Sequence, residues 1–134
     1  LIADARAAVL SLRALKGMLL DAKDHDTWSA GSFFVNPIVS TEIAATLPDD
    51  APRWPQSDGR VKTSAAWLME RAGVKKGDCH EGAGVSTKHV LALVNNGNAK
   101  AADIIELARA SRSAVKDKFG ITLEPEVQFV GITL

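Results

Sequence analysis

Length, composition and charge describe one soluble globular domain and exclude several classes of partner. The 134 residues are 46% hydrophobic and 24% charged, which supplies enough apolar material for one core. Sixteen basic side chains balance sixteen acidic ones, so broad attraction to nucleic acid or to an anionic membrane is not expected. We expect one domain over residues 1–134, acting as a cytoplasmic monomer that binds no metal.

The single cysteine and the hydropathy pattern set further limits. Cys79 can form no internal disulfide, and the Cys79-His80 pair lacks partners at metal-ligand spacing. No apolar run approaches the roughly 20 residues that span a bilayer, and neither a signal peptide nor a glycine-rich nucleotide fingerprint is evident. The chain begins at Leu1 in helical rhythm without a methionine, so we expect a piece of a longer protein.

The first element is an amphipathic helix reaching Leu19. Its apolar residues recur at spacings of three and four, which is the helical period. Arg13 and Lys16 are three residues apart and are therefore neighbours on the helix surface. They form either part of a solvated face or a pair of cations for a phosphate.

A strand and a short helix follow a polar, turn-rich segment at 21–31. The stretch "SFFVNPIVS" at 32–40 favours a strand that Pro37 interrupts or places at an edge. Ser40 or Thr41 then caps a short helix that ends at Pro48. The next segment, 48–59, holds three prolines and is predicted to be a loop.

Trp54 lies within this proline-rich loop. A large aromatic side chain there is usually a local packing anchor, although such loops also present flat faces to bases. The sequence leaves both interpretations open.

The second half of the chain alternates helices with extended segments. Thr63 is expected to cap a helix closed by Gly73, and residues 73–84 form a glycine-rich connection. Val90–Val94 favours a buried strand, and a final helix runs from Asn98 or a neighbour to Gly120. A β-branched strand interrupted at Pro125 ends the chain. This order predicts an α+β fold, with helices packed on a small mixed β-sheet.

Ser32 and the carboxylates of "LEPEV" are the candidates for chemistry. Glu124 and Glu126 are two residues apart, which places them on one face of a regular strand, although Pro125 makes that uncertain. A partly desolvated carboxylate has a raised pKa that suits proton transfer. The alternative is that both glutamates are exposed edge charges.

Ser32 has two chemical interpretations. A serine hydrolase is disfavoured because Phe33 and Phe34 follow the serine and remove the Gly-x-Ser-x-Gly motif. A serine can instead donate a proton to a reactive carbanion, which normally follows hydride addition from a cofactor. The chain itself contains no recognisable site for such a cofactor.

Three motifs in this order and spacing resemble one enzyme family. "SAGSFFVNP", "VKTSAAWLMERAG" and "GITLEPEVQFVG" are similar to the C-terminal domain of UDP-N-acetylenolpyruvoylglucosamine reductase (MurB), and the resemblance extends over essentially the whole chain. It implies an FAD-dependent, NADPH-using oxidoreductase that forms UDP-N-acetylmuramate during peptidoglycan synthesis in the cytoplasm, with consequences for cell shape and division.

The resemblance also implies a division of labour within the enzyme. FAD is held mainly by N-terminal domains that this chain lacks, so no cofactor is expected on this chain alone and the isolated chain is expected to be inactive. The implied partners are those FAD-binding domains and the substrate, UDP-N-acetylglucosamine enolpyruvate. The implied alternative is a non-catalytic module that binds UDP-sugars.

Position by position, the resemblance assigns two catalytic residues. Ser32 matches the serine that donates the proton, and Glu126 matches the carboxyl group that stabilises or protonates the enol. Retention of both favours an enzyme over a binding module.

The remaining matches concern substrate binding. Lys16 and Asn36 match residues that hold the diphosphate, and Arg13 is the cation beside Lys16. Lys76, with Lys75 as the alternative, matches another substrate contact. The last two substrate-binding candidates are His89, where the family can have glutamine, and Trp54, where the related segment has tyrosine.

The sequence departs from the family pattern at three positions. Val35 replaces a lysine, Gln128 replaces an arginine, and Trp54 lacks a phenol hydroxyl. Both acid positions remain intact, so the departures concern charge and hydrogen bonding around the phosphates and the uridine.

Overall fold

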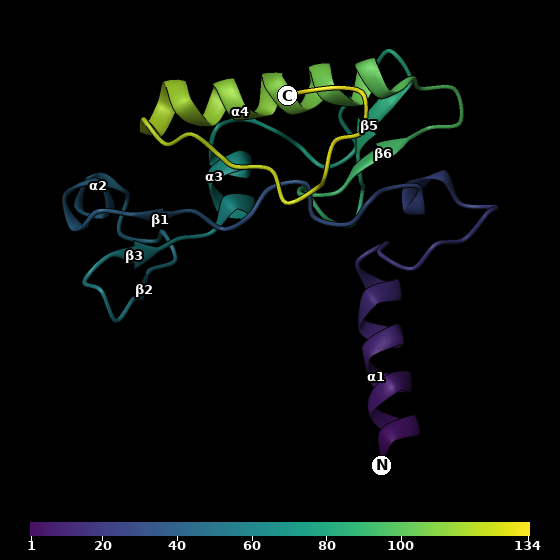
Figure 1. Cartoon of the computed structure of the whole chain (residues 1–134), viewed down its shortest axis with the longest axis horizontal. Helices are drawn as coiled ribbons and strands as arrows, with labels where there is room; N and C mark the ends of the chain where they lie inside the picture. Colours follow the sequence, from purple (N-terminus) through teal and green to yellow (C-terminus); the bar gives the residue numbers. More distant parts are fainter.

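Four α-helices and two small antiparallel sheets make up the computed structural model, which describes all residues from 1 to 134 (Figure 1). The helices are α1 (Ile2–Leu15), α2 (Thr41–Thr46), α3 (Ala65–Arg71) and α4 (Ala101–Phe119). A short 3-10 helix, η1, covers His25–Thr27. No helix is both long enough and apolar enough to cross a bilayer.

The two sheets lie in different parts of the molecule. The first has the order β1-β3-β2 and is built from β1 (Ile38–Val39), β2 (Trp54–Pro55) and β3 (Val61–Lys62). The second has the order β4-β5-β6 and is built from β4 (Cys79–His80), β5 (Ala83–Val85) and β6 (Leu93–Asn95). Helix α4 contacts β5, β6 and α3, whereas the first sheet and α2 lie at the end of the molecule opposite α1 (Figure 1).

The α+β class is confirmed, with one difference in the sheets. Every strand pair and both isolated bridges are antiparallel, so the chain has two antiparallel sheets rather than one mixed sheet. Hairpins need only short connections, and the chain uses one between β4 and β5. Glu81 and Gly82 form its two-residue turn, both with positive φ, as in a type I′ turn. The sequence had predicted only a glycine-rich connection there.

Two predicted strands are shorter than expected. The segment 32–40 forms single bridges at Ser32 and Phe34 and then β1, because Pro37 lacks the N–H that a continuous ladder requires. The C-terminal segment is bridged only at Pro125 and otherwise runs beside α4 without regular pairing (Figure 1). Its β-branched composition was therefore a misleading signal for a strand.

Helix ends follow the expected chemistry with small shifts. Ser40 caps α2 by accepting the N–H of Ile43, and Ser64 rather than Thr63 caps α3. Helix α4 begins after Lys100, whose N–H donates to the Asp103 carboxylate at 2.7 Å, and ends at Gly120 with φ 69°.

Helix α1 differs most from expectation. It ends at Leu15 rather than Leu19, and none of its residues is buried. In Figure 1 it projects away from the rest of the domain. The apolar stripe that predicted the helix therefore has no partner within this chain.

Phe34 belongs to the centre of the core. Its side chain is 1% exposed, and the neighbouring Phe33 ring lies edge-on to it at a centroid distance of 5.0 Å. The same cluster contains Leu68, Met69 and Leu123, which come from α3 and the C-terminal segment. The extended segment that carries Ser32 is thus fixed by the core directly behind it.

We expect Phe34→Ala to lower the free energy of unfolding by about 3–5 kcal/mol, because the ring leaves a cavity that the surrounding side chains cannot fill. Urea unfolding followed by circular dichroism measures this loss. The matched control is Val35→Ala at the adjacent exposed position, where a change within about 0.5 kcal/mol is expected. Equal effects of the two variants would contradict the core assignment.

Candidate functional site

The position of Ser32 is fixed by the backbone of the next residue, Phe33, which forms hydrogen bonds to two other segments of the chain. The Phe33 N–H donates to the Leu91 carbonyl at 2.8 Å, and the Phe33 carbonyl accepts the Glu126 N–H at 2.8 Å. Ser32 itself forms a bridge with Ala92. The serine and Glu126 therefore come from adjacent segments that are far apart in sequence.

Ser32 and Glu126 both line one cavity of about 350 Å³. Arg13 also lines it, which brings a cation of α1 to the two candidate acids. The other lining residues are Met18, Ala30, Gly31 and Val127. The structure gives the Ser32 hydroxyl and the Glu126 carboxylate no hydrogen-bond or ion-pair partner within the chain, so both are available to a ligand.

Gly31 leaves space beside the serine. Its φ is +83°, which L side chains rarely adopt, and a Cβ atom built on it would meet nothing within 4 Å. The glycine is therefore required by backbone conformation, and the open side of the cavity is preserved.

The two glutamates of "LEPE" are separated by the structure. Glu126 lines the cavity at Ser32, whereas Glu124 lines a different cavity beside Asn36. Both glutamates are exposed in this chain. Only Glu126 is positioned to act with Ser32.

A second group of candidate residues surrounds the half-buried imidazole of His89. Burial is the main cause that lowers the pKa of His89, and the positive charges of Lys16 and Lys76 lower it further. Glu70 acts in the opposite direction and lies 3.8 Å from the Lys76 Nζ. Lys16, Lys76 and His89 thus lie close enough to interact, and we call them the cationic cluster.

His89 is held in a defined tautomer. Its Nδ1 accepts the N–H of Leu91 at 3.2 Å, so the proton of the neutral ring lies on Nε2. Protonation of Nδ1 would remove this hydrogen bond, in agreement with the lowered pKa. His89 is therefore arranged as a neutral hydrogen-bond donor.

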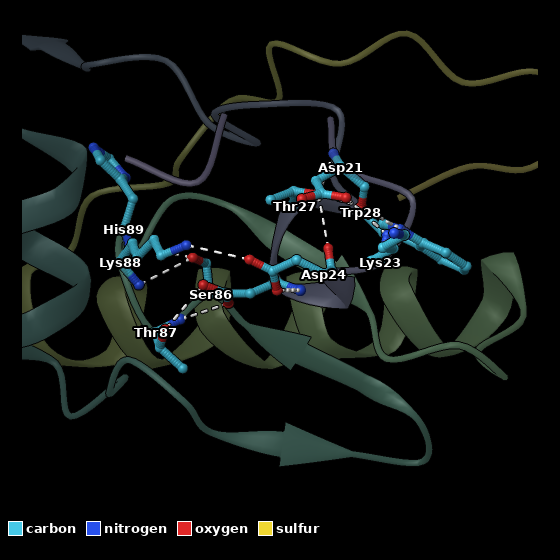
Figure 2. Close-up of polar contacts among 10 residues, drawn as sticks. Asp21, Lys23, Asp24, Thr27, Trp28, Ser86, Thr87, Lys88 and His89 are labelled. Carbon is cyan, nitrogen blue, oxygen red and sulfur yellow. Dashed lines mark hydrogen bonds and ion pairs between the residues drawn. The ribbon is translucent and has the colours of Figure 1, made fainter. Parts of the chain in front are cut away.

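A network of polar contacts attaches the 21–28 turn to the 86–89 turn, as Figure 2 shows. The Asp26 carboxylate accepts both the N–H and the hydroxyl of Thr87, at 2.8 and 2.9 Å. The Lys88 Nζ donates to Asp24 at 3.3 Å, and the Ser86 Oγ accepts the Lys88 N–H. The end of α1 leads into the first turn and His89 belongs to the second, so these contacts hold the two parts of the cationic cluster together.

Asn36 lies outside the cavity of Ser32 and Glu126. Its Oδ1 accepts the N–H of Ala65 at 2.9 Å and thereby satisfies a free donor at the start of α3. It lines a separate cavity of about 610 Å³, together with Arg60 and Glu124. The structure thus gives Asn36 a structural contact and does not place it in the cavity of Ser32.

Trp54 is 46% exposed on β2 and lies directly opposite Lys62 of β3. Opposite residues on an antiparallel pair project from the same face, so an aromatic plane and a cation are offered together. The sequence interpretation had missed Lys62, because only the strand register reveals this pairing.

The fold and the site define a small α+β domain with polar side chains at an open cavity, as in the ligand-binding domain of an enzyme. Residues 22–130 match the family model for the C-terminal domain of UDP-N-acetylenolpyruvoylglucosamine reductase. The chain belongs to this family.

Curated relatives agree with the family match. The chain is 55% identical to a UDP-N-acetylenolpyruvoylglucosamine reductase of Mycobacterium marinum and 51% identical to UDP-N-acetylenolpyruvoylglucosamine reductase 2 of Corynebacterium glutamicum. Each match covers 96% of this chain and 37% of the relative. A reductase of Cutibacterium acnes is 53% identical, with 96% of this chain and 34% of the relative covered. The chain thus spans little more than a third of the length of these relatives.

We expect His89→Gln to make the free energy of unfolding less sensitive to a fall in pH than it is in the wild-type protein. The folded-state pKa of His89 lies below its ordinary value, so between these two pKa values the unfolded chain binds more protons and the wild-type protein loses stability as the pH falls. Urea unfolding at a series of pH values from 8 to about 5 measures the difference between variant and wild type. The variant should gain stability relative to wild type on acidification, and a difference independent of pH would contradict the assignment.

Proposed function

We propose that this chain is the substrate-binding and proton-donating domain of a UDP-N-acetylenolpyruvoylglucosamine reductase. The observation that carries the proposal is the convergence of Ser32, Glu126 and Arg13 on one open cavity. The family match and the names of the relatives supply the reaction class. UDP-N-acetylglucosamine enolpyruvate is the proposed substrate.

FAD is assigned to a part of the enzyme outside this chain. The cavity at Ser32 has a volume of about 350 Å³ and is lined by seven residues, which is enough for the reacting end of a substrate but not for a flavin dinucleotide. The residues that line this cavity would therefore contact at most one edge of the flavin when the rest of the enzyme binds it. NADPH is the proposed reductant of that flavin.

The chemical role of this chain is protonation. The enolpyruvyl group receives a hydride, which is the chemistry that reduced flavin supplies when bound. The adjacent carbon, next to the carboxylate, then carries the electron pair and accepts the proton of the Ser32 hydroxyl. Serine is a weak acid in water, so this step requires a strongly basic carbon held against the hydroxyl in a dry site.

Glu126 and Arg13 act around the same group. As a carboxylic acid, Glu126 donates a hydrogen bond to the enol, or protonates it, while the Arg13 guanidinium neutralises the substrate carboxylate. The exposed position of Glu126 in this chain means that desolvation must come from the bound substrate and the flavin-bearing part of the enzyme.

The cationic cluster is proposed to bind the diphosphate. Lys16 and Lys76 supply charge, and the Nε2–H of His89 supplies a neutral donor. Trp54 with Lys62 is proposed to contact the nucleotide at the other end of the domain. Asn36 remains a candidate diphosphate contact through its Nδ2, because only its Oδ1 is occupied by Ala65.

A module that binds UDP-sugars without chemistry is the second candidate. The exposure of Glu126 favours it, since the structure of this chain alone supplies no desolvated acid. The two candidates differ in whether removal of the Ser32 hydroxyl affects turnover.

In the complete reductase, Ser32→Ala is expected to slow product formation by several orders of magnitude, because no other hydroxyl of this chain lines the cavity. Reduction of the flavin by NADPH should continue at the wild-type rate. Stopped-flow absorbance of the flavin, combined with product analysis, separates these steps. Ser113→Ala, at an exposed position on α4, is the control and should behave as wild type. Normal turnover of Ser32→Ala would refute the acid assignment.

Lys76→Met is expected to weaken the binding of UDP to this chain by about tenfold or more, because it removes a charge-assisted contact to the diphosphate. Isothermal titration calorimetry at fixed salt measures the change. Lys75→Met is the matched control, since its side chain is not among the charges that act on His89. A larger loss for Lys75→Met than for Lys76→Met would reverse this assignment.

A further inference from the structure

The two turns beside the cationic cluster are each held together by one buried hydroxyl (Figure 2). In the 21–28 turn, the hydroxyl of Thr27 accepts the N–H of Asp21 at 2.8 Å. In the 86–89 turn, the Oγ of Ser86 accepts the backbone N–H two residues later, at 3.1 Å. Thr27 is 7% exposed and Ser86 is 0% exposed. Each turn is therefore rigid within itself, so a contact between the two turns sets the position of one relative to the other.

Asp26 makes the most direct contact between these turns. One oxygen of its carboxylate accepts the N–H of Thr87 at 2.8 Å, and the other accepts the Thr87 hydroxyl at 2.9 Å. Because both oxygens are used, the contact fixes an orientation as well as a distance. The ion pair of Lys88 with Asp24 joins the same turns, but both of its side chains are exposed, and exposed pairs contribute little. Asp26 is therefore the main connection.

Gly17 lies where the two turns meet, and it directly follows Lys16. A Cβ atom built on Gly17 would lie 3.4 Å from the carbonyl oxygen of Asp26 and 3.5 Å from the Oγ of Ser86. These two atoms belong to the first and the second turn, respectively. The backbone next to Lys16 thus packs against both turns, and the position of Lys16 depends on their being joined.

We propose that Asp26 is a positioning residue for the diphosphate site: by holding the two turns together it keeps Lys16 beside His89, and it thereby raises the affinity for the diphosphate. Asp26 is itself an acid, and its charge alone opposes the binding of an anion. Its geometric and electrostatic effects on affinity therefore have opposite signs. The inference rests on the proposed function for the identity of the ligand, whereas the placement of Lys16 beside His89 is measurable without any ligand.

UDP binding to this chain, measured by isothermal titration calorimetry at fixed salt, gives the first test. Asp26→Ala should weaken UDP binding by about fivefold or more, as for residues coupled within one network, whereas loss of a negative charge alone would strengthen it. Thr87→Val removes one of the two hydrogen bonds without changing any charge, and it should weaken binding by a smaller factor. Asp26→Asn keeps an acceptor for the Thr87 N–H and a donor to its hydroxyl oxygen, so it should bind UDP as tightly as wild type.

A matched charge control and a double variant locate the effect. Asp49→Ala removes the same charge from an exposed position in neither turn, and it should not weaken UDP binding. If Asp26 acts through Lys16, then Asp26→Ala should change the UDP affinity of the Lys16→Met protein by much less than it changes that of the wild type. An equal loss in both backgrounds, or wild-type affinity of Asp26→Ala, would overturn the proposal.

NMR titration of His89 tests the positioning without a ligand. Burial, followed by the charges of Lys16 and Lys76, lowers the pKa of His89, and Glu70 raises it. Separation of the turns in Asp26→Ala exposes the ring and removes Lys16 from it, so the pKa of His89 should rise, whereas loss of a negative charge alone would lower it. His89→Gln identifies the resonance among the three histidines. An unchanged or lowered pKa would contradict the positioning role.

The outcomes separate this inference from the proposed function. A wild-type chain that binds no UDP would remove the diphosphate assignment from both, and the His89 titration would still decide whether Asp26 positions Lys16. Weakened UDP binding by Lys16→Met, with wild-type affinity and an unchanged His89 pKa in Asp26→Ala, would leave the proposed function intact and remove the role of Asp26. If circular dichroism shows that Asp26→Ala is unfolded, Thr87→Val carries both measurements.

Discussion

The backbone of Phe33 is the constraint on which the candidate site depends. Its N–H and carbonyl bind two segments that are distant in sequence, one carrying His89 to Ala92 and the other carrying Glu126. The core rings of Phe33 and Phe34 prevent this extended segment from shifting. A shift of one residue would turn Ser32 away from the cavity and break both hydrogen bonds. Ser32 is thus positioned by packing behind it rather than by contacts to its own side chain.

The carboxylate of Asp26 has a corresponding role for the cations. By accepting two hydrogen bonds from Thr87, it ties the turn after α1 to the turn before His89. Ionised acceptors make stronger hydrogen bonds than neutral ones, so this contact is well suited to fix two irregular segments. Positive charge is then concentrated locally in a chain whose net charge is zero. The site consequently has two parts, the cavity of Ser32 and Glu126 and the cationic cluster. The hydrogen bond from the Phe33 N–H to the carbonyl of Leu91, two residues after His89, joins them.

The sequence predicted helices α2, α3 and α4 well, because capping residues and apolar spacing are local signals. It also predicted that Ser32 and Glu126 act together, but through family resemblance rather than through residue pattern. The separation of Glu124 from Glu126 and the pairing of Trp54 with Lys62 depend on long-range register, which no local signal encodes. The C-terminal strand was overpredicted because β-branched residues favour strands only where a neighbouring edge is available.

The central claim is that the cavity bounded by Ser32 and Glu126 receives the enolpyruvyl end of the substrate. A crystal structure of the complete reductase with bound UDP-N-acetylglucosamine enolpyruvate tests it most directly. The account predicts the carbon next to the carboxylate within about 3–3.5 Å of the Ser32 Oγ, the separation of a near-attack geometry, with the diphosphate on Lys16, Lys76 and His89. An enolpyruvyl group bound away from Ser32, with the diphosphate on other residues, would contradict it.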